Sequence, residues 1–277
     1  MNRWFLYLML VAGLVFLSGC RKSDRDEDKE LQSAEDFGIA QATFADLFHQ
    51  LDLYCAGLAD VNRNSQPGLQ NCASVTVNPA LPNPSFPKTV SIDFGPVNCA
   101  GPDGVLRRGV ITAVLSGRYR DSLSTITITP NNFYRNDIRV LGTQVVTNQG
   151  RINGVLTYSV SDQNCSLVFP DTKTISWDSN RSRRWINGES TPGDFSDDSY
   201  EISGTASGRG TKGNTFTANT VSGAPLLVSM NCRYIKSGKL ILKPANLLDR
   251  EIDFGSGACD DKATVTIAGK TYEITLR

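Results

Sequence analysis

The sequence predicts a mostly all-β protein with antiparallel sheets and one N-terminal helix. Segments rich in Val, Ile, Thr and Tyr fill most of the chain after residue 88, and residues 125–129 and 264–267 alternate with period two. Only one long segment has helical spacing, so parallel βαβ units are excluded and antiparallel strand pairs follow. A sandwich-like arrangement and an extended meander both fit this pattern.

Residues 1–19 are expected to form a secretory signal peptide. Arg3 precedes an apolar run from Trp4 to Leu17, and two small residues end the segment. A membrane-spanning helix needs roughly 20 apolar residues. Because this run is shorter and a charged stretch follows it, we expect cleavage rather than an uncleaved anchor helix.

The end of this segment, Leu17-Ser18-Gly19-Cys20, resembles the bacterial lipobox. The resemblance implies that Cys20 becomes the first residue of the mature chain and carries a diacylglyceryl thioether and an amide-linked acyl chain. Two or more acyl chains anchor a protein stably, because each buried methylene contributes about 0.8 kcal/mol. We therefore expect the membrane to be a partner of this protein through the lipid on Cys20.

Residues 20–32 are expected to form an acidic, solvated tether, because residues 21–30 are almost all charged. Their acidic bias directly after Cys20 also resembles the export signal that sends lipoproteins of Bacteroidota to the outer face of the outer membrane. We expect a lipid-anchored protein of the outer membrane at the cell surface, with the periplasmic face as the alternative.

Residues 33–61 are expected to form the single helix. Ser33 followed by Asp36 is an N-cap signal. His49, the only histidine of the chain, lies on this helix, where packing or exposure is more common than chemistry. Apolar residues recur at helical spacing, and we expect their stripe to pack on the sheet: Phe44, Leu47, Phe48, Leu51, Tyr54, Cys55 and Leu58.

The β domain is expected over residues 71–277, after a loop rich in Asn, Ser, Pro and Gly at 62–70. The region 180–198 is interpreted as a strand, a polar turn and an acidic loop. The other predicted strands cover residues 89–95, 109–119, 124–129, 137–147, 154–161, 172–177, 200–205, 226–235, 239–242, 263–268 and 271–276.

Both ends of the β domain carry a copy of one motif, at an offset of 160 residues without a gap. A single active site would not need two copies, so we interpret the motif as structural, with hairpins that close the two ends of the domain. An Asp before Phe-Gly commonly accepts hydrogen bonds from nearby backbone. The copies are Asn71-Cys72 with Ile92-Asp93-Phe94-Gly95-x-x-x-Cys99, and Asn231-Cys232 with Ile252-Asp253-Phe254-Gly255-x-x-x-Cys259.

The cysteines of an exported chain meet an oxidising compartment and are expected to pair. The repeated motif predicts two disulfides, Cys72 with Cys99 and Cys232 with Cys259, and pairing of Cys72 with Cys232 across the copies is the alternative. Cys55 and Cys165 are left over, and either pair with each other or stay reduced. Zinc sites use close cysteine pairs and histidines, which this sequence lacks, so we expect structural disulfides and no metal.

Three further motifs carry a resemblance to a known family. They are Phe86-Pro87-Lys88-Thr89, the turn Gly101-Pro102-Asp103-Gly104 before Arg107-Arg108-Gly109, and the run from Cys259 to Val265. Together with the repeated motif they resemble a family of β-rich lipoproteins of Bacteroidota, over most of residues 71–277. No activity or catalytic residues are assigned to that family, so the resemblance implies a location and a fold only.

Nothing in the sequence predicts catalytic residues or a cofactor. There is no G-x-S-x-G motif for a nucleophilic serine. The 28 basic and 28 acidic residues leave no excess positive charge for nucleic acid. We therefore expect a non-catalytic binding or structural module at the cell surface, with a glycan or a protein as the ligand class.

Two alternatives stay open. A carbohydrate-binding lipoprotein of a nutrient-uptake system would use an aromatic platform, for which the candidates are Trp177, Trp185, Tyr119, Phe133 and Tyr134. A carboxylate-dependent hydrolase would use two acidic residues at a set separation, for which the candidates are Glu189, Asp194, Asp197 and Asp198.

The lipobox generates a direct prediction about Cys20. Mass analysis of the mature N-terminus should find acylated Cys20, and Cys20→Ser should abolish incorporation of a labelled fatty acid. Protease added to intact cells should degrade the protein if it lies at the cell surface. An unmodified N-terminus at another residue would contradict the lipid anchor, and protection until the outer membrane is opened would place the chain on the periplasmic face.

Overall fold

The structure, a computed structural model, describes residues 27–59, 73–191, 194 and 196–276. It contains one α-helix and one antiparallel sheet of 15 strands, so the predicted class is confirmed and the sheet is an extended meander rather than a sandwich. The elements are α2 (Gln32–Ala59), β1 (Ser74–Asn78), β2 (Lys88–Asp93), β3 (Cys99–Ala100), β4 (Leu106–Leu115), β5 (Thr125–Arg135), β6 (Ile138–Ile152), β7 (Val155–Val168), β8 (Thr174–Asn187), β9 (Ser199–Arg209), β10 (Thr215–Thr220), β11 (Leu226–Ser229), β12 (Ser237–Pro244), β13 (Arg250–Ser256), β14 (Lys262–Ile267) and β15 (Lys270–Thr275).

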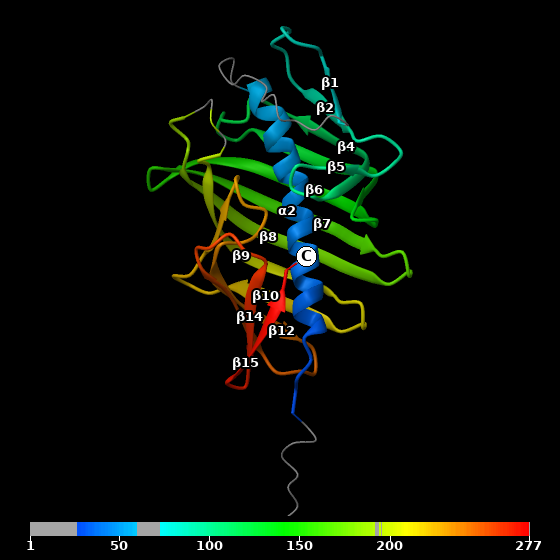
Figure 1. The fold of residues 1–277 in the computed structure, drawn as a ribbon. Helices are drawn as coiled ribbons and strands as arrows, with labels where there is room; N and C mark the ends of the chain where they lie inside the picture. Colours follow the sequence, from blue (N-terminus) through cyan, green and yellow to red (C-terminus); the bar gives the residue numbers. More distant parts are fainter. Residues whose placement is uncertain (1–26, 60–72, 192–193, 195, 277) are drawn as a thin grey trace, which may run out of the picture.

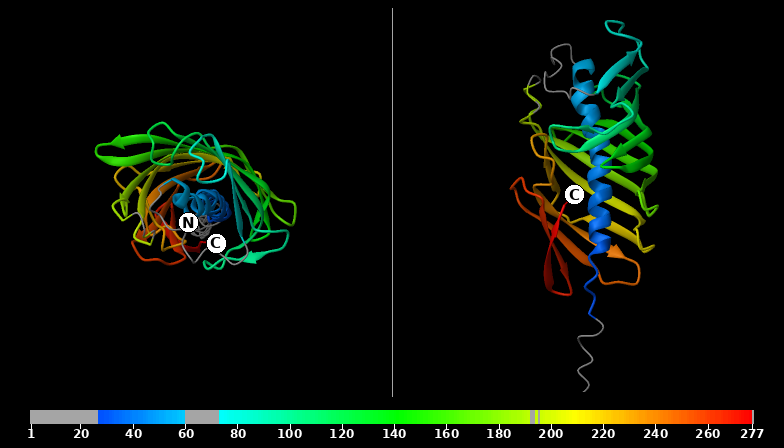
Figure 2. Two further views of the ribbon diagram at one scale, coloured as in Figure 1. Left: turned by 90° about the horizontal axis from the view of Figure 1, so that it is seen from above. Right: turned by 45° about the vertical axis from the view of Figure 1, so that its right-hand side comes forward.

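The strands follow one another in the sheet in nearly the order of the sequence, from β1 at one edge to β15 at the other (Figure 1). Only β3, which pairs with β4, and β11, which pairs with β9 and β12, lie off this path. The sheet curls around α2, which runs through the hollow of its concave face (Figure 2). α2, the first element in the described part of the chain, is therefore enclosed by the strands that follow it.

Glycine-containing bulges accompany the curvature of the long central strands. The register between β4 and β5 shifts at Gly109, and that between β6 and β7 shifts at Gly142. Both glycines have positive φ, and a Cβ atom at Gly109 would lie 2.0 Å from the backbone oxygen of Asn132. Bulges bend a strand and increase its twist, which a sheet needs in order to wrap around a helix.

The apolar stripe of α2 packs on the sheet as predicted. Phe44, Leu47, Phe48 and Leu51 are buried, and the ring of Phe44 stacks on that of Trp177 with centroids 6.0 Å apart. The side chains of Tyr54, Cys55 and Leu58, the rest of the predicted stripe, lie outside the described part of the structure, as do residues 60 and 61 of the predicted helix. The helix is anchored by one aromatic and aliphatic core.

Aspartates of α2 are buried as well, which the apolar stripe of the helix did not predict. Asp46 accepts hydrogen bonds from Nε and Nη2 of Arg107 at 2.9 and 2.5 Å, and Asp52 accepts one from Nη2 of Arg183 at 2.8 Å. Arg107 lies on β4 and Arg183 on β8, both on the concave face. Charged groups are buried at a large cost unless they are paired, so the arginines of the sheet make it possible to enclose this helix.

Residues 27–30, expected to be part of a solvated tether, are held against the sheet. The buried guanidinium of Arg250 donates to Asp28 at 2.9 Å, and the backbone NH of Leu248 donates to the other carboxylate oxygen of Asp28 at 2.9 Å. The side chain of Glu30 accepts from the backbone NH of Ser33, so Glu30 rather than Ser33 caps the start of α2.

The two copies of the repeated motif share one local hydrogen bond, although β2 ends at Asp93 and β13 continues to Ser256. Asp93 accepts a hydrogen bond from the backbone NH of Gly95 at 2.8 Å, and Asp253 accepts one from Gly255 at 2.9 Å. Both glycines have positive φ, which favours glycine. The copies lie on β2 and β13, close to opposite edges of the sheet, and the predicted structural role of their aspartates is confirmed.

Several strand boundaries differ from the predicted ones. β1, β3, β10 and β13 lie outside the predicted strand ranges, and β8 continues through residues 180–187, where a strand and then a turn were expected. The predicted strand over residues 226–235 ends at Ser229, because a loop follows that carries a disulfide at Cys232. Within the described residues, no helix is both long and apolar enough to cross a membrane.

The Arg107 and Asp46 pair generates a stability prediction. Burial raises the pKa of Asp46, but the charge and hydrogen bonds of Arg107 outweigh burial and hold it below the usual value. Asp46→Asn should lower the free energy of unfolding at pH 7 by about 3–5 kcal/mol, since it leaves a buried arginine without its main partner. Asp171→Asn, in an exposed pair with Lys173, is the matched control and should leave stability unchanged.

The difference between wild type and Asp46→Asn should depend on pH. A carboxyl whose pKa is lower in the folded state than in the unfolded state stabilises the protein above the unfolded pKa, near 3.9 for Asp, and this contribution is lost as the pH falls through the folded pKa. Urea unfolding from pH 7 to pH 2 measures it. A difference that stays constant over this range would contradict the assignment.

Candidate functional site

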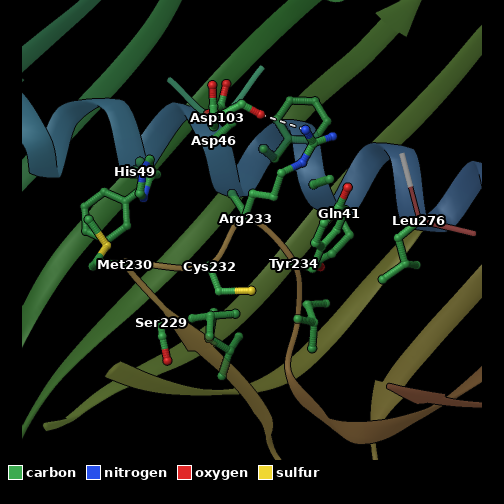
Figure 3. A pocket seen from close by; sticks show the side chains of 18 of the residues that line it. Gln41, Asp46, His49, Asp103, Ser229, Met230, Cys232, Arg233, Tyr234 and Leu276 are labelled. Carbon is green, nitrogen blue, oxygen red and sulfur yellow. Dashed lines mark hydrogen bonds between the residues drawn. The ribbon is translucent and has the colours of Figure 1, made fainter. Parts of the chain in front are cut away.

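A cavity of about 620 Å³ lies between α2 and the loop formed by residues 230–236, on the open side of the curved sheet (Figure 3). The loop crosses to the other half of the sheet, where Arg233 donates a hydrogen bond to the backbone oxygen of Asp103 at 2.7 Å. Gly38, Ala42, Ala45 and His49 of α2 line the cavity from one side. Gly38, Ala42 and Ala45 are small and leave space that larger side chains would fill.

The wall opposite the helix is largely apolar. Its side chains are only half-buried, although they pack against the core, because one side of each reaches the cavity: Val160, Ile202, Val228, Met230, Ile235 and Leu276. Cavities lined by apolar side chains with a few convergent polar groups are the usual form of small-molecule sites.

Arg135 and Arg181 supply the positive charge of the cavity. Arg135, the last residue of β5, is 6% exposed and makes no hydrogen bond among the described residues, and its nearest carboxylate is Asp46, with Nε 3.6 Å from Oδ2. Arg181 of β8 donates from Nη1 to Gln41 and forms no ion pair within the described part of the chain. Burial lowers the pKa of Arg181 to about 10, against the opposing charge of Asp162.

The carboxylates of the cavity wall are already occupied. Asp46 is bound by Arg107 and by Gln50, whose Nε2 lies 3.1 Å away. Asp162 accepts from Gln144 at 2.8 Å, from the indole NH of Trp177 at 2.9 Å and from the hydroxyl of Ser179 at 2.5 Å. Among the described residues, the site therefore has several hydrogen-bond donors that lack an acceptor, and few acceptors that are free.

Arg183 and His49 complete the polar part of the site. The guanidinium of Arg183 lies between the rings of Tyr200 and Phe48, 3.6 and 4.2 Å from their centroids, and pairs with Asp52. His49 is half-buried at the edge of the cavity, and burial lowers its pKa against the opposing charges of Asp46 and Asp52. At neutral pH His49 is thus a neutral imidazole.

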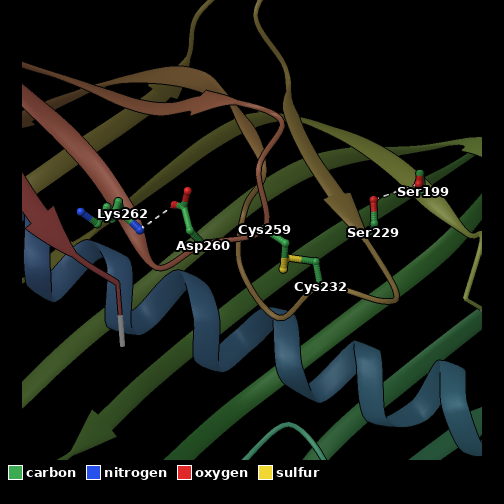
Figure 4. The surroundings of a disulfide bond; sticks show 6 residues. All are labelled: Ser199, Ser229, Cys232, Cys259, Asp260 and Lys262. Carbon is green, nitrogen blue, oxygen red and sulfur yellow. Dashed lines mark hydrogen bonds between the residues drawn. A yellow bond between two sulfur atoms is a disulfide. The ribbon is translucent and has the colours of Figure 1, made fainter.

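The disulfide between Cys232 and Cys259 holds the 230–236 loop, with Cα atoms 5.8 Å apart (Figure 4). This confirms one predicted pairing and excludes the alternative pairing of Cys72 with Cys232. Cys99 is also disulfide-bonded, and its predicted partner Cys72 lies outside the described residues. A bond that closes a loop of this length corresponds to roughly 3–4 kcal/mol in the chain-entropy model.

Cys165 is a free, buried cysteine. Its sulfur lies near the backbone oxygens of Gln163 and Thr143, at 3.5 and 3.6 Å, and burial together with the charge of Asp162 raises the pKa of its thiol to about 12. A thiol is reactive only as a thiolate, so this group is inert at neutral pH.

The aromatic residues considered for a sugar platform do not form an exposed surface. Four of them, Trp177, Trp185, Tyr119 and Phe133, are buried. The fifth, Tyr134, is covered on one face by the guanidinium of Arg108, 3.9 Å from its ring centroid. Core packing is therefore the role of the four buried rings, and Trp177 alone among the five also lines the cavity.

The four acidic residues considered for hydrolysis lie away from the cavity lining and have local partners. Glu189 is paired with Arg151, Asp194 accepts from the backbone NH of Ser196 at 2.8 Å, and Asp197 accepts from Thr191 at 2.7 Å. Asp198 is buried. Among the described residues, no group of three or more His, Cys, Asp and Glu side chains is placed to hold a metal ion.

The arginines of the cavity were missed at the sequence level, although a signal for them exists. In β8, the residues with odd numbers from 175 to 185 alternate onto one face, and Trp177 and Trp185 near its ends mark that face as buried. Arg181 and Arg183 lie between the two tryptophans on the same face, so they had to be enclosed with a partner.

Comparison of the chain with protein-family models, with curated proteins and with solved structures gives no match. The geometry of the site is that of a half-open cavity with one apolar wall, two incompletely paired arginines and a loop held by a disulfide.

The environment of Cys165 predicts its reactivity. Iodoacetamide at pH 8 should alkylate Cys165 far more slowly in the folded protein than in 6 M guanidinium, because burial suppresses the thiolate. Peptide-level mass spectrometry separates this cysteine from the others. Equal rates in the folded and unfolded protein would show that the thiol is accessible and ionised.

Proposed function

We propose that this protein is an exported, lipid-anchored module of the outer membrane that binds a small molecule without transforming it. The observation that carries the binding role is the cavity between α2 and the 230–236 loop. Its volume of about 620 Å³ falls within the range of roughly 300–1,000 Å³ that is common for small-molecule sites.

The way the cavity is built supports retention of a ligand. α2 forms its rigid floor, and the disulfide at Cys232 and the hydrogen bond from Arg233 to Asp103 hold the loop above it. A pre-formed site loses little conformational entropy when a ligand enters.

Binding without catalysis is supported by the state of the ionisable groups. A general acid or base works best with a pKa near the operating pH. Asp46 and Asp103 have lowered pKa values, because their interactions with Arg107 outweigh burial, and both are committed to that arginine. Asp162 is used by three internal donors.

The N-terminal residues support the proposed location. The signal peptide and Cys20 support attachment to a membrane, and the acidic residues that follow support the cell surface over the periplasmic face. The resemblance to β-rich lipoproteins of Bacteroidota is consistent with this location. A glycan or a protein bound at the outer loops stays a competing proposal, and the buried rings of Trp177 and Trp185 give it no support.

The binding role can be tested with a substitution that fills the cavity. Ala45 faces the cavity from α2, so Ala45→Trp should occupy the space, whereas Val97→Trp adds the same ring at a position that is 72% exposed and outside the lining. The mature chain in phosphatidylcholine nanodiscs should transfer tryptophan excitation energy to the neutral apolar dye N-phenyl-1-naphthylamine in a saturable way. Ala45→Trp should weaken this binding at least about tenfold and Val97→Trp should not.

Empty nanodiscs give the blank for dye in the bilayer, and thermal unfolding by circular dichroism shows whether both variants fold. Wild type without saturable transfer, or a folded Ala45→Trp variant that binds the dye as wild type does, would refute the cavity as the binding site.

A further inference from the structure

Resting on the binding role proposed above, we infer that the ligand is an organic anion with an apolar body, and that Arg135 binds its anionic group. Four features of the cavity lead to this assignment: an arginine without a hydrogen bond, carboxylates that are already occupied, a second incompletely used arginine and an apolar wall.

Arg135 is the decisive residue. It is opposite Arg107 in the register of β4 and β5, so two arginines reach toward the single carboxylate of Asp46. Arg107 takes both oxygens of Asp46, and Arg135 is left with Nε 3.6 Å from Oδ2, beyond a hydrogen bond. A guanidinium carries five NH donors and does not lose its charge in proteins. Arg135 is thus an enclosed cation at the cavity wall that lacks a hydrogen-bonded partner among the described residues.

The surroundings of Arg135 do not provide the missing acceptor. Arg233 lies at the rim of the cavity and Arg107 beside Arg135, and both are cations. Asp103 is bound by Nη1 and Nη2 of Arg107 at 3.0 and 2.6 Å. Arg135 shares the carboxylate of Asp46 with Arg107 and forms no hydrogen bond with it, so its burial is incompletely compensated. An anion that enters the cavity can therefore gain a charge-assisted hydrogen bond from Arg135.

Arg181 offers a second donor on the same cavity. Its only hydrogen bond among the described residues goes to Gln41, a neutral acceptor, and its guanidinium lies 5.1 Å from the ring centroid of Trp177. The buried Oε1 atom of Gln144 has no donor and adds one acceptor for a hydroxyl or an amide of the ligand. The polar groups of the cavity are therefore mainly donors, and they favour a ligand with several hydrogen-bond acceptors.

The rest of the ligand has to be apolar. Met230, Ile235 and Leu276 expose part of their surface to the cavity, and burial of apolar surface contributes roughly 25 cal/mol per Å². A fully polar anion such as inorganic phosphate would leave this wall uncovered. A carboxylate pairs with a guanidinium through two parallel hydrogen bonds, and a phosphate monoester can do the same.

The experiment compares probes that differ only in the head group. The mature chain in neutral phosphatidylcholine nanodiscs is titrated by calorimetry with 4-phenylbutyrate, 4-phenylbutyl phosphate and the neutral 4-phenylbutanamide, with empty nanodiscs as the blank. At least one of the two anions should bind about tenfold or more tightly than the amide, and the tighter of them identifies the head group.

Variants assign the role to Arg135. Arg135→Gln should weaken binding of the anion at least about tenfold and leave binding of the amide unchanged, and Arg181→Gln should weaken the anion less. Arg151→Gln, an exposed arginine paired with Glu189 outside the cavity, is the matched control and should change neither. Arg135 makes no hydrogen bond among the described residues, so Arg135→Gln breaks none. The variant should therefore unfold at the same temperature as wild type or at a higher one. A purely structural role of Arg135 would instead predict a lower unfolding temperature.

The outcomes separate the two proposals. Equal binding of anion and amide would overturn the anion assignment and leave the cavity as an apolar binding site. Preference for the anion that persists in Arg135→Gln would overturn the role of this residue. Binding of none of the three probes, together with no saturable uptake of the neutral dye, would overturn the binding role itself.

Discussion

The ion pair between Arg107 and Asp46 is the interaction on which the arrangement depends. A helix with buried aspartates can pass through the hollow of a sheet only if the sheet supplies cations at matching positions. Arg107 and Arg183 do this for Asp46 and Asp52, and Arg250 does it for Asp28 at the start of the helical region. The apolar contacts of Phe44 and Leu47 stabilise the helix, and the ion pairs set its rotation and depth.

The same pairing helps to explain why a cavity lies at this place. Arg135 occupies the position next to Arg107, but the helix offers Asp46 to both, and only Arg107 forms hydrogen bonds with it. Gly38, Ala42 and Ala45 are too small to fill the space between helix and loop. Arg135 is thus incompletely paired at the place where α2 is incompletely packed against the loop, and one cavity results. Cavities with an apolar wall and a few polar groups commonly bind small molecules.

The fold class could be predicted from the sequence because it depends on local patterns. Alternation in residues 125–129 and helical spacing from Phe44 to Leu51 are visible without tertiary information. The repeated motif also predicted the local bonds of Asp93 and Asp253 and the disulfide of Cys232, since equivalent residues adopt equivalent structures. The cavity could not be predicted, because Ala45, Arg135 and Met230 come together only through the curvature of the sheet. The helical periodicity of the apolar residues also did not predict that aspartates of α2 are buried.

The enclosure of α2 constrains the order of events during folding. Asp46 and Arg107 are 61 residues apart in the sequence, Asp52 and Arg183 are 131 apart, and Asp28 and Arg250 are 222 apart. Contacts so distant form late and slow folding down. α2 is synthesised before all of the strands that enclose it, and Arg250, which pairs with Asp28 just before the helix, lies near the end of the chain. The core around α2 is therefore completed late in synthesis. Until then, the apolar and charged faces that later enclose α2 are exposed, and exposed apolar surface favours aggregation.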